Sequence, residues 1–588
     1  MNTKLLPSLF LLLFFPIIAF SQFDYERYWG SYFGDLQIYV KAAALDHAGN
    51  VYMAGIAVDY LAGEPLFAFT TPETHQPIYG GGAADGFIVK FNPEGELLWG
   101  TYFGGEGDDR IEEIVITEDK FIYVSGSTTS LTNIASPGAF QQELNGPSDV
   151  FLAKFNLEGE RLWSTYFGGD GKEATGFVNS DETGMRLAVQ PQGNIFFSMN
   201  TLSEGLGTEG TFQPEKQESN HLISSFSPEG ERIWSTYYGI NLSNISGIAI
   251  TDSGIMVGGW SVDCPPLYTY NTYFGTPGAH LEEPNFCRAA FLSKFNFNGQ
   301  RVWSTYYGGQ GGTIAFRNSV ATFGDAVYFG GVSIGTSRGI ATEGAYQETS
   351  PGTSHFVVKF NADGRRQWGT YCGTREIIYG DYAHLGNIGV DASGNVFLSG
   401  STYNDQMIAS PDGYQTEIAG LDDAFVVKFS PDGDHLWGTY YGGPLKERNA
   451  MALPFEDNFY IIGRTTSLEG IATPESFQTT FEPNPNLSNQ YVPYFVRFGP
   501  ERLATETRET PKFVLYPNPN DGRFTISLPE KVSDGTIEIQ NLLGQTLKVE
   551  KIQSVEVVIT LENLPKGIYL TKIKSAGKTV DAKKMIVR

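Results

Sequence analysis

Two acidic, glycine-rich loops hold the residues best suited to bind a metal ion. They are residues 105–109 (Gly-Glu-Gly-Asp-Asp) and residues 168–171 (Gly-Gly-Asp-Gly). Carboxylate and backbone carbonyl oxygens are the ligands that Ca²⁺ prefers. No copy has the D-x-D-x-D-G spacing, however, and the Asp positions of these loops do not recur along the chain. We therefore expect solvated turns and no cofactor, with Ca²⁺ as the one metal that these loops could hold.

The strongest candidate for ligand contact is the long segment of residues 260–288. Four of its aromatic residues could contact a ligand, namely Trp260, Tyr268, Tyr270 and Tyr273. Its Cys264 and Cys287 lie 23 positions apart. A disulfide that closes a loop of this size stabilises a protein by roughly 3 kcal/mol, so we predict one here. Cys372 stands where other copies of a repeat have Phe or Tyr, and we expect it to be buried.

The sequence contains no recognisable catalytic constellation. H-E-x-x-H, G-x-S-x-G, P-loop and C-x-x-C motifs are absent, and the seven His residues show no metal-ligand spacing. We therefore predict no catalytic residues and no metal ligands.

A repeated hairpin accounts for seven of the eight Trp residues. In six copies an apolar strand ends in Phe, a turn containing Gly follows, and Trp comes eight residues after the Phe. Turns such as residues 92–95 (Asn-Pro-Glu-Gly) combine Pro and Gly as tight hairpins require. The six pairs are Phe91 and Trp99, Phe155 and Trp163, Phe226 and Trp234, Phe295 and Trp303, Phe360 and Trp368, and Phe429 and Trp437.

Half a hairpin remains at each end of the repeat array. Trp29 has no Phe strand before it, and the strand of residues 494–498 has no Trp after it. Successive Trp residues are 64 to 71 positions apart, which is room for about four strands of ~5 to 6 residues. Pairing the two halves would close a ring without exposed strand edges. We predict an all-β fold in which residues 22–500 form a seven-bladed β-propeller of four-stranded blades with this N/C velcro closure.

Connections within the predicted blades alternate between short turns and long loops. Successive connections of an antiparallel meander emerge on opposite faces, so the long loops should gather on one face of the ring. Ligand binding is expected on that face.

The two ends of the chain differ from the repeat array. Residues 1–21 contain an apolar stretch and end in Ala-Phe-Ser, which predicts a secretory signal peptide. No other segment reaches the ~18 apolar residues of a membrane span. Residues 512–588 carry 12 Lys and Arg against 8 Asp and Glu, while the rest of the chain carries 28 against 58. We predict a linker over 501–511 and, because of its short alternating runs, a small β-sandwich over 512–588.

The C-terminal segment resembles the sorting domain of the type IX secretion system of Bacteroidetes. The resemblance covers about residues 513–588 and rests on four motifs in the family's order. Their key residues are Tyr516, Pro517, Asn518 and Pro519 with Gly522; Gly544; Gly567 with Tyr569; and Lys583 with Lys584. The resemblance implies that an outer-membrane translocon reads this domain. It also implies a secreted or cell-surface location reached through the periplasm.

Residues 29–498 resemble the SBBP family, which is named for a seven-bladed β-propeller repeat. The likeness includes a signature before the third strand, seen at residues 135–141 (Ala-Ser-Pro-Gly-Ala-Phe-Gln), 341–347 and 472–478. That family has no shared reaction, so the resemblance implies a fold and no function. The net charge of −26 disfavours nucleic acid and anionic membranes as partners. We predict a non-catalytic binding or adhesion module that meets a protein or glycan outside the cell.

The alternative is a secreted propeller enzyme that acts on a polysaccharide or glycoconjugate. The spacing of Gly364 and Trp368 also occurs in quinoprotein propellers, and residues 430–437 are one position away from a sialidase Asp box. Both patterns belong to the structural framework of the blades and not to a catalytic site. A pocket at the ring axis with converging carboxylates or an Arg cluster would favour the enzyme, whereas a flat aromatic loop surface would favour binding.

Overall fold

A computed structural model gives the structure of most of the chain. It describes residues 25–59, 67–174, 184–217, 221–262, 272–375, 386–403, 406–483, 490–500, 513–516, 520, 522–528, 535–541, 545–561, 565–575 and 578–587. The chain divides into two compact units, residues 1–501 and residues 502–588. All the regular elements of the described residues are β-strands. Among these residues, no helix has the length and apolar character needed to cross a membrane.

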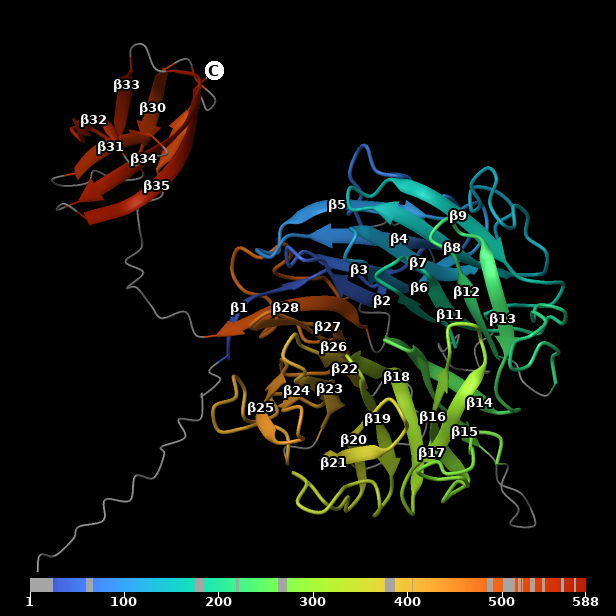
Figure 1. The fold of residues 1–588 in the computed structure, drawn as a ribbon. Helices are drawn as coiled ribbons and strands as arrows, with labels where there is room; N and C mark the ends of the chain where they lie inside the picture. The colour runs from blue at the N-terminus through green and yellow to red at the C-terminus, as the bar shows by residue number, and fades with distance from the viewer. Residues whose placement is uncertain are drawn as a thin grey trace, which may run out of the picture. The chain divides into compact units, whose positions relative to one another are not determined.

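Seven four-stranded antiparallel sheets form the first unit (Figure 1). Six of them follow chain order. Blade 1 is β2 (Ile38–Leu45), β3 (Val51–Val58), β4 (Ala84–Phe91) and β5 (Leu97–Phe103). Blade 2 is β6 (Asp109–Ile116), β7 (Phe121–Thr128), β8 (Asp149–Asn156) and β9 (Arg161–Phe167). Blade 3 is β10 (Arg186–Val189), β11 (Ile195–Asn200), β12 (His221–Phe226) and β13 (Arg232–Tyr237).

The remaining blades repeat this order. Blade 4 is β14 (Ser243–Thr251), β15 (Gly254–Val262), β16 (Arg288–Phe295) and β17 (Arg301–Tyr307). Blade 5 is β18 (Gly312–Phe323), β19 (Ala326–Ile334), β20 (Thr353–Phe360) and β21 (Arg366–Arg375). Blade 6 is β22 (Gly386–Val390), β23 (Val396–Thr402), β24 (Asp423–Phe429) and β25 (His435–Tyr441). Blade 7 is β26 (Glu447–Phe455), β27 (Asn458–Thr465), β28 (Val492–Pro500) and β1 (Tyr25–Tyr32).

The first strand of each blade lies at the ring axis. These strands contact one another in a closed cycle, from β2 through β6, β10, β14, β18, β22 and β26 back to β2. The predicted seven-bladed propeller is therefore confirmed.

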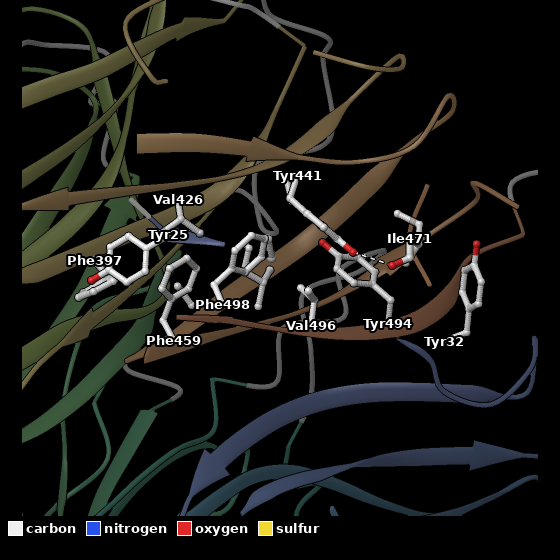
Figure 2. Packing of buried hydrophobic residues seen from close by; sticks show 14 of the residues in the cluster. Tyr25, Tyr32, Phe397, Val426, Tyr441, Phe459, Ile471, Tyr494, Val496 and Phe498 are labelled. Carbon is white, nitrogen blue, oxygen red and sulfur yellow. Dashed lines mark hydrogen bonds between the residues drawn. The ribbon is translucent and has the colours of Figure 1, made fainter. Parts of the chain in front are cut away.

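The predicted closure of the ring is also confirmed. β1 pairs antiparallel with β28, from Tyr25 opposite Pro500 to Tyr32 opposite Tyr494. Figure 2 shows the core behind this seam, where the rings of Phe459 and Phe498 stack with their centroids 5.0 Å apart. Blade 7 thus combines both ends of the repeat array, as the two half-hairpins required.

The repeated Trp connects a blade to the following blade through a hydrogen bond. In six copies its indole Nε1 donates a hydrogen bond of 2.7 to 3.0 Å to a carbonyl in the outer turn of the following blade. These donors and acceptors are Trp29 and Pro93, Trp99 and Leu157, Trp163 and Pro228, Trp234 and Phe297, Trp303 and Ala362, and Trp368 and Pro431. The Gly of this turn has a positive φ and packs against the indole ring, as Gly364 does against Trp303. Any other residue would be strained at this φ, and its Cβ would press on the indole ring.

The seventh Trp departs from this pattern. No turn joins β28 to β1, because the chain ends supply these two strands separately. Trp437 instead lies edge-on to Tyr25, with ring centroids 4.8 Å apart, and is fully buried.

The second unit consists of two antiparallel sheets. One contains β29 (Val514–Tyr516), β30 (Arg523–Ser527) and β33 (Glu556–Thr560). The other has the order β32 (Thr546–Lys551), β31 (Gly535–Asn541), β34 (Gly567–Ser575) and β35 (Lys578–Val587). Phe524 and Ile526 of the first sheet share a buried core with Ile537 and Ile573 of the second. This is the predicted small β-sandwich.

Candidate functional site

A β-bulge recurs in the strands that line the ring axis. The pairing register shifts at the same depth in five of the seven innermost strands, β2, β6, β14, β18 and β26. The extra residues left by these shifts include Lys41, Glu112, Ser246, Arg317 and Asn449. Bulges are typical of places where a sheet must redirect a side chain beside a functional site.

A glycine in the neighbouring strand makes room for the bulges of β2 and β6. A Cβ on Gly55 would lie 1.9 Å from the Tyr39 carbonyl oxygen, and a Cβ on Gly126 would lie 1.9 Å from the Arg110 carbonyl oxygen. Such close backbone approach requires Gly. The Gly near the end of the second strand therefore accompanies the bulge in blades 1 and 2, whereas Gly400 of blade 6 occupies the same position in a pair of strands without a register shift.

We call the space around the ring axis the channel. On one side of it, two arginines and two glutamates connect four blades. Arg317 of blade 5 reaches Glu113 of blade 2, with Nη2 2.9 Å from Oε1, and its Nη1 lies 3.5 Å from Glu112 Oε2. Arg186 of blade 3 places Nη1 3.5 Å from the same Glu113 oxygen and donates from Nε to the Ser246 carbonyl of blade 4 at 2.6 Å. Burial raises the pKa of Glu113, while the two guanidinium groups lower it.

A pocket of about 80 Å³ occupies the other side of the channel. Residues of blades 1, 5, 6 and 7 line it, at the end of the channel where the long loops lie. Its charged residues are Lys41, Arg317 and Arg464, and no carboxylate belongs to its lining among the described residues. Its other polar lining residues are Tyr39, Asn318, Asn387, Asn449 and Tyr491. The axial pocket, as we call this cavity, therefore has a cationic and amide-rich wall.

Pairs of buried carboxyl groups lie between blades 1 and 2, 2 and 3, and 6 and 7. A Cβ built on Gly104 would lie 2.3 Å from Asp85 Oδ1 and 2.8 Å from Asp109 Oδ2, so both side chains converge on this glycine. Gly168 and Gly442 occupy the same place in the other two pairs. The pairs are Asp85 with Asp109, Asp149 with Glu173, and Asp423 with Glu447.

These pairs correct one statement of the sequence analysis. Acidic positions do recur from blade to blade, because each pair consists of an Asp that opens a third strand and an acid 24 positions later. The signature before the third strand orients the first acid, since Gln141 Nε2 donates to Asp149 Oδ2 at 2.6 Å. Gln415 donates to Asp423 Oδ2 at the same distance.

Burial raises the pKa of the carboxyl groups in all three pairs. The pKa rises to about 7 for Asp85, to about 7 for Glu173 and to about 7 for Glu447. In each case the neighbouring acid raises it further, and hydrogen bonds from hydroxyl or backbone N–H groups oppose the shift. A buried carboxyl pair holds a proton more readily than two separate acids do.

The acidic loop of residues 105–109 uses its carboxylates within the protein. Asp109 accepts hydrogen bonds from Gly105 N and Ser130 Oγ, both at 2.7 Å. Glu106 Oε2 accepts one from Thr132 Oγ1 at 2.7 Å. Within the described part of the chain, no group of three or more His, Cys, Asp or Glu side chains could hold a metal ion.

The aromatic candidates of residues 260–288 are only partly described. Trp260 is half-buried, with the Arg288 guanidinium 5.9 Å from its ring centroid. Tyr273 is also half-buried, and its hydroxyl donates to Gln213 Oε1 at 3.0 Å. Trp260 therefore packs against the core between blades 4 and 5, and Tyr273 packs against the core between blades 3 and 4. Tyr268 and Tyr270 lie outside the described residues.

The structure tests one of the two predictions made for the cysteines. Cys264 lies outside the described residues, so its disulfide with Cys287 stays a prediction. Cys372 is fully buried as predicted, and burial raises the pKa of its thiol to about 12.

Several predicted sorting residues have structural roles in the second unit. The hydroxyl of Tyr569 donates to the Pro565 carbonyl at 2.7 Å, and Gly522 has a φ of +97° that favours glycine. Tyr516 is exposed, and the Lys583 ammonium lies 5.4 Å from the ring centroid of Phe513. Gly567 opens β34, and Lys584 lies in β35. Pro517, Asn518, Pro519 and Gly544 lie outside the described residues.

The second unit matches a known sorting family. Residues 514–588 match the family described as the secretion system C-terminal sorting domain. This indicates sorting by the type IX secretion system, with export to the cell surface or the medium.

One relative and three solved structures resemble longer parts of the chain. An uncharacterized WD repeat-containing protein of Acanthamoeba polyphaga mimivirus is 25% identical over 333 residues, which are 48% of this chain and 23% of the relative. A fungal alcohol oxidase of the AA5 family in complex with copper has 11% identity and a TM-score of 0.37, covering 95% of this chain and 99% of its own.

The other two structures are equally distant. A phage endosialidase has 10% identity and a TM-score of 0.35, with 96% and 87% of the two chains covered. The β-propeller domain of the Trilobed protease from Pyrococcus furiosus has 8% identity and a TM-score of 0.35, with 79% and 99% covered. Likeness at this level carries no argument about activity.

Proposed function

We propose that this chain is a propeller exported by a Bacteroidetes-type type IX secretion system and that it binds a glycan or protein outside the cell. Residues 1–21 would act as a removable signal peptide, and residues 512–588 would dock on the secretion translocon after a linker over 501–511. The match of the second unit to a sorting family supports the route. The axial pocket supports the binding role.

The axial pocket carries the binding proposal because it is preformed and brings several polar groups together in a partly apolar wall. Side chains from four blades meet there, and bulges of β2, β18 and β26 place Lys41, Arg317 and Asn449 in its wall. Concave sites with a few convergent polar groups are the usual place for ligands. Blade scaffolding alone does not require cationic residues at this point.

A binding array tests this proposal. The exported chain, residues 22–588, is applied to glycans and extracellular proteins beside a Lys41→Trp variant, whose larger ring would fill the pocket. We expect the wild type to retain at least one ligand that the variant loses. Tryptophan fluorescence and the melting curve control for folding. Absence of any retained ligand, or equal retention by both chains, contradicts the proposal.

A polysaccharide-cleaving enzyme is the second candidate. Glu112 and Glu113 lie in the channel, and Glu113 has a raised pKa, as a general acid requires. Both carboxylates face arginines, however, and neither lines the axial pocket. New reducing ends from a bound polysaccharide, lost in Glu113→Gln, would favour this alternative.

A further inference from the structure

We propose that the axial pocket recognises an acidic sugar, a ligand with one carboxylate and several hydroxyl groups. This inference rests on the proposed binding function and adds the chemistry of the ligand. It depends on three features of the pocket, namely its charge, its amide groups and its size.

The charged residues of the described pocket wall are all cationic. Lys41, Arg317 and Arg464 line the pocket, and the described lining contains no Asp or Glu. The charge of Arg317 is paired with Glu112 and Glu113 behind the wall, so Lys41 and Arg464 supply the positive charge. The ion pairs of the described residues do not include Lys41, so its ammonium has no carboxylate partner there. An ammonium and guanidinium groups in a concave site favour a carboxylate, because hydrogen bonds between ionised groups are the strong ones.

Arg317 is held in place by the opposite side of the channel. Its guanidinium contacts Glu113 at 2.9 Å and Glu112 at 3.5 Å, and its side chain is only 20% exposed. Arg464 lies over the ring of Tyr491, with its Cζ 4.8 Å from the centroid. These contacts orient both cations before a ligand arrives, which lowers the entropy lost on binding.

Amide side chains in the pocket wall can form hydrogen bonds with the hydroxyl groups of a ligand. Asn318, Asn387 and Asn449 line it, and an amide side chain both donates and accepts hydrogen bonds. Asn449 Oδ1 is buried and has no hydrogen-bond partner among the described residues. A sugar hydroxyl would satisfy this acceptor, whereas acetate has no proton donor to offer it.

The size of the pocket limits the ligand to a small group. A volume of about 80 Å³ corresponds to roughly five to eight water positions, at about 10 to 15 Å³ each. That space suits one acidic sugar unit, free or at a chain end. The net charge of −26 on the whole chain would repel long polyanions, so a single carboxylate at a local cationic site is the favoured form.

Calorimetric titration of the exported chain tests this ligand chemistry. The probes are glucuronic and galacturonic acid, their short oligosaccharides, the matching neutral glucose and galactose compounds, acetate and inorganic phosphate. We expect the acidic sugars to bind at least about 10-fold more tightly than their neutral counterparts, because a charged hydrogen bond is at stake. Acetate and phosphate should bind more weakly than the acidic sugars, and added salt should weaken binding of the acidic sugars.

Three variants locate the effect. Lys41→Gln removes one charge from a side chain that forms no ion pair with another described residue. Asn449→Asp adds a carboxylate of the same shape at a φ of +57° that Asp tolerates. Each should lower affinity for the acidic sugars by about 10-fold or more. Lys120→Gln, on the opposite short-turn face, is the matched control and should change nothing.

The outcomes separate this inference from the binding proposal. Equal affinity for acidic and neutral sugars, or full affinity in Asn449→Asp, overturns the acidic-sugar inference while the binding proposal stands. Stronger binding of phosphate or acetate than of the acidic sugars also overturns it. If no ligand depends on the pocket in the Lys41→Trp array, both proposals fail.

Discussion

The wild-type propeller should lose unfolding free energy as the pH rises, because Glu447 becomes charged in a buried position. Replacement of Glu447 by Gln should remove this loss. Glu447 is fully buried between blades 6 and 7, and burial raises its pKa from 4.5 to about 7. The native state therefore favours the protonated carboxyl, which Gln imitates in shape and hydrogen bonding. Its stabilising contribution is complete below the unfolded pKa of 4.5 and is lost as the pH rises through about 7.

The expected magnitude follows from the size of the shift. At 1.36 kcal/mol per pKa unit, a rise from 4.5 to about 7 corresponds to about 3 kcal/mol, of which about 2 to 3 kcal/mol is lost between about pH 5 and about pH 8. Relative to wild type, Glu447→Gln should thus gain about 2 to 3 kcal/mol of unfolding free energy over this interval.

Urea titrations followed by tryptophan fluorescence measure this gain. All eight Trp residues lie at or before Trp437, so the signal reports the propeller and not the second unit. Glu94→Gln, on an exposed turn, is the matched control and should show no such gain. A difference between Glu447→Gln and wild type that is the same at both pH values would refute the reasoning.

Three further perturbations test the ring and the export route. Trp437→Ala should cost about 3 to 5 kcal/mol of unfolding free energy, because a fully buried ring is lost; a cost near zero in urea titrations would contradict its role at the seam. Deletion of residues 23–34 should cause aggregation or a large drop in melting temperature, since β28 would lose its partner; an unchanged melting curve argues against the closure. Truncation at Ala504 should leave a folded propeller in the periplasm, and fractionation that finds it at the surface or in the medium would contradict sorting by the second unit.

The blades could be predicted from the sequence because their scaffold repeats the same residue types. Six of the seven repeat Trp residues contact the same kind of turn in the next blade, so the Phe-to-Trp spacing is constant. The half-hairpins at Trp29 and residues 494–498 then required closure, which the pairing of β1 with β28 confirms.

The axial pocket could not be predicted in the same way, because the bulge residues differ from blade to blade. Lys41, Glu112 and Ser246 occupy equivalent bulges with different chemistry, so no repeat of residue type marks them. The glycine beside the bulges of β2 and β6, as at Gly55, was only a partial signal, because Gly400 occupies the same position without a register shift. The carboxyl pairs were missed because their members lie 24 positions apart, in different blades.

A crystal structure of the chain with the first ligand retained on the array tests the central claim most directly. We predict ligand density in the axial pocket, within hydrogen-bonding distance of Lys41 and Asn449. Density beside Trp260 and Tyr273 of blade 4, with an empty axial pocket, would contradict the account.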